Sequence, residues 1–154
     1  MAERPPYPLA KAALALLVIT LAPSSSAAWE FTPGDPCVLT HTTDDVEVTL
    51  TYDPVTPLYS FSLKQAQPFP AASVFGLQFS GPLSLAIGTD RHQFSDAGRR
   101  VTVEDNGFGN VLNGMQYNDA MIATIGNQLI AVSLEGAADP VAAFRACEGP
   151  EPVS

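Results

Sequence analysis

Basic residues are scarce in this sequence of 154 residues. It holds 7 Lys and Arg against 16 Asp and Glu, a formal net charge of −9. Removal of the leader predicted below, residues 1–28, takes away Glu3, Arg4 and Lys11, which leaves 15 acidic and 5 basic residues and a formal charge of −10. Because affinity for nucleic acids and for anionic lipid surfaces comes largely from Lys and Arg, the sequence argues against both as partners. A cation or a cationic partner stays open, although a high net charge also serves solubility alone.

Motifs for nucleotide and hydrolase chemistry are absent as well. No phosphate-binding loop ends in Gly-Lys-Ser or Gly-Lys-Thr, because Lys64 is the only lysine after the leader and no glycine lies near it. No Gly-x-Ser-x-Gly motif occurs. Only 2 Cys and 2 His are present, and the spacing of Cys37 and His41 separates them by about 13 Å along a strand. The sequence therefore predicts no metal site and no cofactor.

The sequence has no hydrophobic run of the roughly 20 residues that a membrane-spanning helix needs. The apolar run 12–22 is about half that length, follows basic residues, and gives way to small residues that end at Ala28. This pattern is typical of a secretory signal peptide. We therefore expect residues 1–28 to be removed, Trp29 to become the N-terminus, and the protein to be periplasmic or secreted.

The two cysteines, Cys37 and Cys147, nearly bracket the rest of the chain. In an oxidising compartment two lone cysteines usually pair, so a disulfide is predicted in preference to a metal or catalytic thiol. The chain-entropy model assigns a loop of this size about 4.7 kcal/mol of stabilisation. We expect a single domain over 29–147, followed by a flexible tail over 148–154 that contains two prolines and no apolar periodicity.

Most of the chain after the leader shows the period of two that is typical of half-buried strands. In 46–52, the residues predicted to face inward are Val46, Val48, Leu50 and Tyr52. Strands are predicted at 46–52, 59–63, 74–79, 83–87, 100–104, 121–125 and 129–134, with a hairpin turn at Gly126-Asn127. The fold class predicted is mainly β (α+β). We expect an antiparallel sandwich or barrel-like sheet with a short C-terminal helix, tied to the first strand by the disulfide.

Two short helices are predicted. The C-terminal helix has Asp139 as its N-cap, Pro140 in its first position and Phe144 on its core face. The other helix follows Asn110, and Gly114 weakens it because glycine is a poor helix former.

Five segments carry a resemblance to a known family. They are Trp29-Glu30-Phe31 with Cys37, Thr89-Asp90-Arg91-His92, 107–112, 133–137 and 143–147. With these segments the chain resembles small exported alphaproteobacterial proteins often labelled as a component of the ABC excinuclease, over nearly all of its length after the leader. The last part also distantly resembles invasion-associated locus B proteins. The resemblance implies export and supplies no catalytic residue. The excinuclease label conflicts with the acidic charge, the leader and the missing phosphate loop.

Three adjacent residues, Asp90, Arg91 and His92, bring together a carboxylate, a guanidinium and an imidazole, which are suited to acid–base chemistry. On a strand, Asp90 and His92 would share one face while Arg91 pointed to the other. His92 and Asp90 are therefore the candidate catalytic pair. The simpler interpretation, which we favour, is a polar loop or strand end with an ion pair.

Two further segments are candidates for ligand binding. The loop 105–110 is rich in glycine and asparagine, but it lacks the acid spacing of a calcium loop and any lysine for phosphate, so a turn is the favoured interpretation. Trp29, Phe31 and Phe108 form either a ligand-facing aromatic set or part of the core, and core packing is the more usual outcome.

Three functional hypotheses remain. The first is a non-catalytic binding or accessory protein of the cell envelope, with a protein or a small ligand as its partner. The second is a small periplasmic hydrolase that uses His92 and Asp90. The third is a structural or inhibitory protein that acts through a sheet edge. A pocket that joins His92 to a nucleophile would favour the hydrolase, whereas an exposed apolar patch would favour a protein partner.

Overall fold

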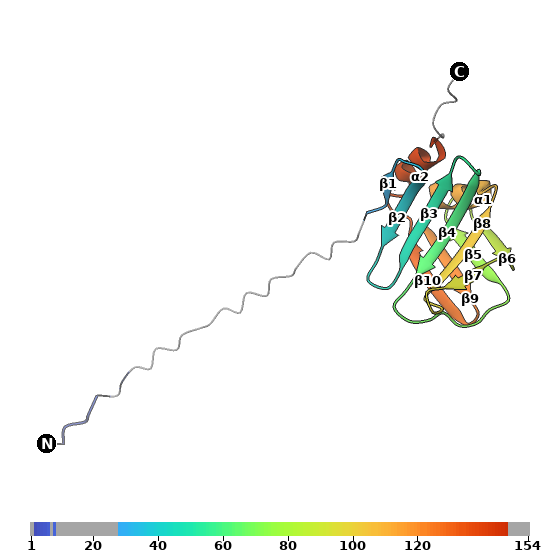
Figure 1. Cartoon of the computed structure of the whole chain (residues 1–154). Coiled ribbons are helices and arrows are strands. Elements are labelled where there is room, and N and C mark those ends of the chain that lie inside the picture. Colours follow the sequence, from blue (N-terminus) through green and yellow to red (C-terminus); the bar gives the residue numbers. More distant parts are fainter. Residues whose placement is uncertain (1, 7, 9–27, 148–154) are drawn as a thin grey trace.

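The structure, a computed structural model, describes residues 2–6, 8 and 28–147. The apolar run of the predicted leader and the predicted tail at 148–154 lie outside the described residues. Within these residues, ten strands form two antiparallel sheets that face each other, with two short helices at one end (Figure 1). The predicted mainly β class is confirmed. In the described ranges, no helix is long and apolar enough to cross a membrane.

The larger sheet has the strand order β1-β2-β3-β4-β8-β7. Its strands are β1 (Glu30–Thr32), β2 (Cys37–Thr42), β3 (Glu47–Asp53), β4 (Leu58–Lys64), β8 (Arg100–Asp105) and β7 (Gln93–Ser95). The smaller sheet has the order β10-β9-β5-β6. Its strands are β10 (Gln128–Ser133), β9 (Ala120–Ile125), β5 (Phe75–Ser80) and β6 (Leu85–Thr89). The predicted strands are all present. β2 corresponds to the first strand, which was expected to carry Cys37 but was given no bounds, whereas β1 and β7 were not predicted because three residues are too few to show an alternation.

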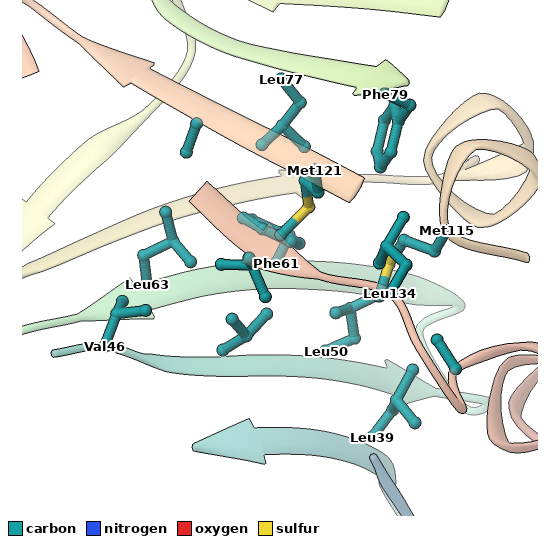
Figure 2. Packing of buried hydrophobic residues seen from close by; sticks show 14 of the residues in the cluster. Leu39, Val46, Leu50, Phe61, Leu63, Leu77, Phe79, Met115, Met121 and Leu134 are labelled. Carbon is teal, nitrogen blue, oxygen red and sulfur yellow. The ribbon is translucent and has the colours of Figure 1, made fainter. Parts of the chain in front are cut away.

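Alternating side chains fill the space between the sheets. In the β3–β4 register, Leu50 lies opposite Phe61 and Val48 opposite Leu63, and all four side chains are buried. The facing sheet contributes Leu77, Phe79 and Met121, among others (Figure 2). Tyr52, also predicted to face inward, is only half-buried. It stacks on Tyr59 of the neighbouring strand, with 4.3 Å between the ring centroids.

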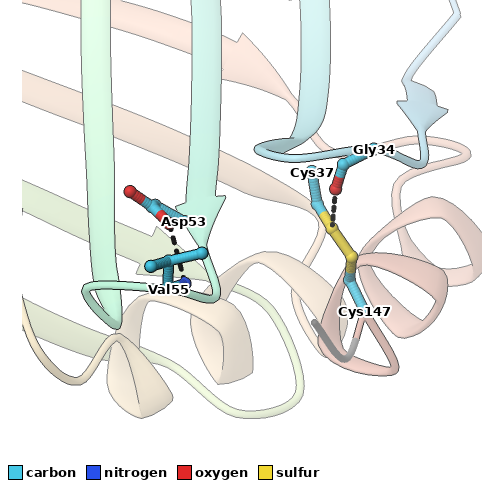
Figure 3. Close-up of a disulfide and its surroundings, with 5 residues drawn as sticks. All are labelled: Gly34, Cys37, Asp53, Val55 and Cys147. Atoms are coloured by element: carbon cyan, nitrogen blue, oxygen red, sulfur yellow. Dashed lines mark hydrogen bonds between the residues drawn. A yellow bond between two sulfur atoms is a disulfide. The ribbon is translucent and has the colours of Figure 1, made fainter. Parts of the chain in front are cut away.

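The disulfide ties the C-terminal helix to the larger sheet. Helix α2 (Ala138–Arg145) packs against α1 (Gly109–Gln116), β1 and β2. Cys37, the first residue of β2, is bonded to Cys147 just after α2, and their Cα atoms are 6.5 Å apart (Figure 3). This lies within the range of about 4.4–6.8 Å that disulfides require. The predicted pairing is therefore confirmed.

The predicted start of α2 is wrong by two residues. Ala137 takes the N-cap position and offers no side-chain hydrogen bond, while Asp139 and Pro140 lie inside the first turn. Both residues are suited to that position, because a negative charge near a helix N-terminus is favourable and proline lacks only an N–H that has no intrahelical partner there. The helix therefore begins without the side-chain cap that the sequence predicted.

Trp29 links the two sheets at the N-terminal end of the described domain. Its indole Nε1–H donates to the Ser133 carbonyl at the end of β10 (3.1 Å). The same ring stacks on His41 of β2, with centroids 4.5 Å apart and planes within 10°. Trp29 is buried, so this contact satisfies its N–H out of reach of water.

Buried Asn118 attaches α1 to the turn between β5 and β6. Its Nδ2 donates to the carbonyls of Leu83 (2.9 Å) and Gly114 (3.0 Å), and its Oδ1 accepts from the Leu83 N–H (3.0 Å). A buried amide is stable only when its donors and acceptors are paired, and here they are. Asn118 therefore fixes where α1 ends against the smaller sheet.

Gly114 allows α1 to lie directly on the smaller sheet. A Cβ at this position would come within 2.3 Å of the Phe79 ring, and Phe79 is itself buried. The sequence predicted Gly114 only as a weakness of the helix. In the structure its lack of a side chain is what permits the contact between α1 and β5.

We expect Gly114→Ala to destabilise the protein by roughly 1–3 kcal/mol, because overpacking against Phe79 outweighs the gain of about 1 kcal/mol in helix propensity. Gly109→Ala is the matched control in the same helix, since nothing lies within 4 Å of its added Cβ. Urea denaturation checks both variants. Equal stabilities for Gly114→Ala and Gly109→Ala would contradict the packing argument.

Candidate functional site

Asp90, Arg91 and His92 lie in the connection between β6 and β7, not on a strand. The favoured interpretation, a polar loop with an ion pair, is therefore confirmed, and Asp90 and His92 do not share a strand face. The His92 Nε2 lies 2.8 Å from the Ala72 carbonyl oxygen, and the ring packs edge-on against Phe94. Within residues 28–147, no hydrogen bond joins His92 to Asp90 or to a hydroxyl or thiol group. The proposed catalytic role of this pair stays a prediction.

A cavity of about 410 Å³ opens between the two sheets, on the side of β6 and β8. It is lined by Phe61, Phe75, Leu77, Ile87, Gly88, Thr89, Arg91, Val103, Asp105, Gly107, Phe108, Gly109, Asn110 and Val111. Half of these residues are large and apolar, and they come from β4, β5, β6, β8, α1 and Phe108 at the N-cap of α1. The polar side chains are exposed or half-buried, which places them at the rim. His92 and Asp90 are not among the lining residues.

An ion pair spans the rim of the cavity. The Arg91 guanidinium, 64% exposed, donates to the Asp105 carboxylate at the end of β8. The backbone of Arg91 is held in place as well, because its N–H donates to the Thr89 hydroxyl (3.1 Å). Of the three adjacent residues that the sequence singled out, the structure therefore brings only Arg91 to the cavity.

Backbone N–H groups, as well as Arg91, hold the Asp105 carboxylate in place. The Arg91 hydrogen bond, followed by the backbone N–H of Asn106 (2.7 Å) and then that of Gly107, holds the pKa of the Asp105 carboxyl below its usual range. The two backbone contacts come from the loop 105–110, for which the sequence predicts a turn. The carboxylate is therefore firmly held at the rim, and Arg91 reaches it from the connection between β6 and β7.

Phe108 forms part of the cavity wall and is positioned by a stack of aromatic rings. Tyr59 lies between Tyr52 and Phe108, with ring centroids 4.3 Å and 5.4 Å away respectively. Burial in this stack raises the pKa of the Tyr59 hydroxyl. The favoured core packing of the three aromatic residues is confirmed, because Trp29 and Phe108 are buried in the core and Phe31 packs against it. Phe108 also lines the cavity, whereas Trp29 and Phe31 do not.

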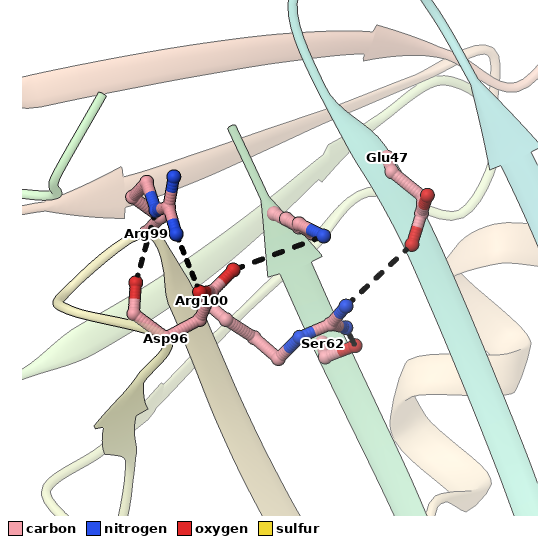
Figure 4. Close-up of polar contacts among 6 residues, drawn as sticks. Glu47, Ser62, Asp96, Arg99 and Arg100 are labelled. Atoms are coloured by element: carbon pink, nitrogen blue, oxygen red, sulfur yellow. Dashed lines mark hydrogen bonds and ion pairs between the residues drawn. The ribbon is translucent and has the colours of Figure 1, made fainter. Parts of the chain in front are cut away.

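The other ion pairs among the described residues lie outside this site. Asp96 pairs with Lys64 (3.7 Å) and Arg99 (2.7 Å), while Arg100 contacts Glu47 (3.8 Å) and donates to the Ser62 hydroxyl (3.0 Å), as Figure 4 shows. A second hollow is lined by 43–46, 65–68 and 128–131, which include the exposed Asp44 and Asp45. Across residues 28–147, no group of three His, Cys, Asp or Glu side chains is arranged to hold a metal ion.

Comparison of the chain with family models, with curated proteins and with solved structures found no match. The resemblance to exported alphaproteobacterial proteins therefore stays a prediction. The residues of the site offer an apolar interior, one guanidinium and one carboxylate held by hydrogen bonds.

Arg91→Gln should raise the pKa of Asp105 toward its usual value, although the Asn106 and Gly107 N–H groups keep it lowered. Because the pKa is lowered in the folded state, the ion pair contributes above the usual carboxyl range and is lost as the pH falls through the folded-state pKa. An NMR titration of the carboxyl carbons measures this. Asp96, whose pKa is lowered mainly by Arg99, is the internal control and should not move. A shift of equal size at both residues would contradict a specific Arg91 contact.

Proposed function

We propose that this protein is a non-catalytic binding protein of the cell envelope that holds a small, largely apolar ligand between its two sheets. The observation that carries the proposal is the cavity of about 410 Å³, with its apolar walls and its polar rim. Ligand pockets typically measure about 300–1,000 Å³ and combine apolar walls with a few polar groups that orient the ligand. The cavity has both properties.

The walls of the cavity favour an apolar occupant over water. Phe61, Phe75 and Leu77 are buried, and Ile87 and Val103 are partly buried against the same core. A bound water is stable where it makes about three hydrogen bonds, and these side chains offer none. An apolar ligand group would instead recover dispersion contacts that the walls lack on one side.

The hydrolase alternative has no geometric observation in its favour. The His92 Nε2 is engaged by the Ala72 carbonyl, and the Nδ1 is buried without a hydrogen-bond partner. A general base needs a nucleophile within hydrogen-bond reach and an orienting group. The sheet-edge alternative has an edge strand, β10, with Leu129 70% exposed, but no observation identifies what would cover it.

The envelope location rests on two supports. The disulfide between Cys37 and Cys147 is compatible with an oxidising compartment. The sequence begins with the pattern of a secretory signal peptide, and the first buried residue among those described is Trp29, which the expected cleavage would leave at the N-terminus. The periplasm is the compartment that we propose.

Octanol, an uncharged amphiphile, should bind the purified disulfide-bonded protein and raise its melting temperature by several degrees, because a ligand at about 100 times its Kd stabilises a protein by about 2.7 kcal/mol. Val103→Phe places a larger side chain in the cavity and should abolish this shift. Differential scanning calorimetry measures the effect.

Val55→Phe is the matched control, since Val55 is 72% exposed in the β3–β4 turn and the same substitution leaves the cavity open. If Val103→Phe fails to fold, Ile87→Phe fills the cavity from the opposite sheet. The absence of a shift in the unsubstituted protein, or an equal shift in a folded filled variant, would rule out the cavity as the binding site.

Export predicts that the chain recovered from an osmotic-shock fraction begins at Trp29 or within a residue or two of it. N-terminal sequencing of the protein expressed in a Gram-negative host checks this. Replacing Leu16 and Leu17 in the apolar run by Arg should retain the full-length chain in the cytoplasm, because the leader loses its hydrophobic region. Recovery of a chain that begins at Met1 from the osmotic-shock fraction would contradict a cleaved leader.

A further inference from the structure

We infer that the ligand is an amphiphile with a carboxylate head group, which Arg91 binds at the rim while the apolar tail lies between the sheets. This inference rests on the proposed function and specifies the class of ligand. It starts from the one guanidinium among the residues that line the cavity.

Arg91 has unused hydrogen-bonding capacity. A guanidinium carries five N–H donors in a planar fork, and the described contacts of the Arg91 side chain occupy the Nη2 nitrogen only, through Asp105. The side chain is 64% exposed, so the other donors face solvent. A carboxylate matches the fork with two parallel hydrogen bonds. Arg91 can therefore bind a second carboxylate without releasing Asp105.

Asp105 makes the rim less suited to a cationic head group. Its carboxylate already accepts hydrogen bonds from Arg91 and from the Asn106 and Gly107 backbone. A cation would have to compete with the Arg91 guanidinium for the remaining lone pairs and would lie close to that like charge. Asp105 thus acts as a positioning residue that holds Arg91 over the cavity.

The backbone around the cavity agrees with an anionic head group. The first turn of α1 lines the cavity through Gly109, Asn110 and Val111, has no side-chain cap and contains no acidic residue. Open space surrounds Gly107 and Gly109, because a Cβ at either position would meet nothing within 4 Å. The partial positive charge of an uncapped helix start therefore faces the same rim as Arg91.

The negative net charge of the protein is the reason why the ligand needs an apolar tail. With a formal charge of −10 after the predicted cleavage, the protein repels small anions at long range. Lys64, Arg99 and Arg100 each pair with an acidic residue elsewhere on the surface. An anion without an apolar tail would thus gain little, and the tail has to supply most of the affinity through burial.

The test compares octanoate, octanol, octylammonium and acetate by isothermal titration calorimetry at neutral pH and low salt. Arg91→Gln should weaken octanoate about fivefold, the loss expected for one exposed charge-assisted contact, and leave octanol unchanged. The same variant should bind octylammonium more tightly, because Asp105 is then uncovered. Acetate should show no measurable binding to either protein. Added salt should weaken octanoate binding in the unsubstituted protein and not in Arg91→Gln.

Arg99→Gln is the matched control, since it removes an exposed Arg that pairs with Asp96 away from the cavity. It should leave all four affinities as they are. Octanoate affinity equal in the unsubstituted protein and in Arg91→Gln, or an equal loss in Arg99→Gln, would overturn the inference. Octanol binding that Val103→Phe abolishes would leave the proposed function intact in that case, so the two failures are distinguishable.

Discussion

Packing between two sheets that share no strand is the constraint on which the rest of this structure depends. Every strand pairing in the described residues falls within one sheet or the other, so backbone hydrogen bonds hold each sheet together but do not hold the pair. The pair is held by buried side chains such as Leu50, Phe61 and Phe79. Two hydrogen-bonded contacts, Trp29 to Ser133 and Gln65 to Gln128, add to this packing and link the larger sheet to the smaller one.

Both of these cross-sheet contacts involve β10, one edge of the smaller sheet. The Gln65 and Gln128 amides donate to each other reciprocally, at 3.3 Å and 2.8 Å. At the other edge of that sheet, β6, the contact with the larger sheet is the exposed ion pair of Arg91 and Asp105. The two sheets are therefore linked by part-buried hydrogen bonds along β10 and, near β6 where the cavity lies, by an exposed and weaker ion pair.

The sequence predicted the features that depend on local patterns and missed those that depend on the meeting of distant segments. The alternation at 46–52 reflects burial of one face, so it located β3 to within a residue. The cysteine pair followed from compartment chemistry alone. The polar loop with an ion pair that the sequence favoured for Asp90 to His92 is confirmed, but nothing local signals that the partner of Arg91 is Asp105 at the end of β8. Residues from five elements line the cavity, and no pattern of residues along the chain predicts that these elements come together.

Some glycines of this protein are required by the fold, whereas others only leave the backbone at the cavity rim uncovered. Gly126 has a positive φ of 59° in the β9–β10 turn, and Gly114 lies against the Phe79 ring, so both positions need glycine for the fold. Gly107 and Gly109 have neither constraint, because their φ angles are ordinary and a Cβ would meet nothing. Glycine at such positions costs conformational entropy with no return in packing. Its effect is to leave the backbone at the rim uncovered, which agrees with the ligand site that we propose.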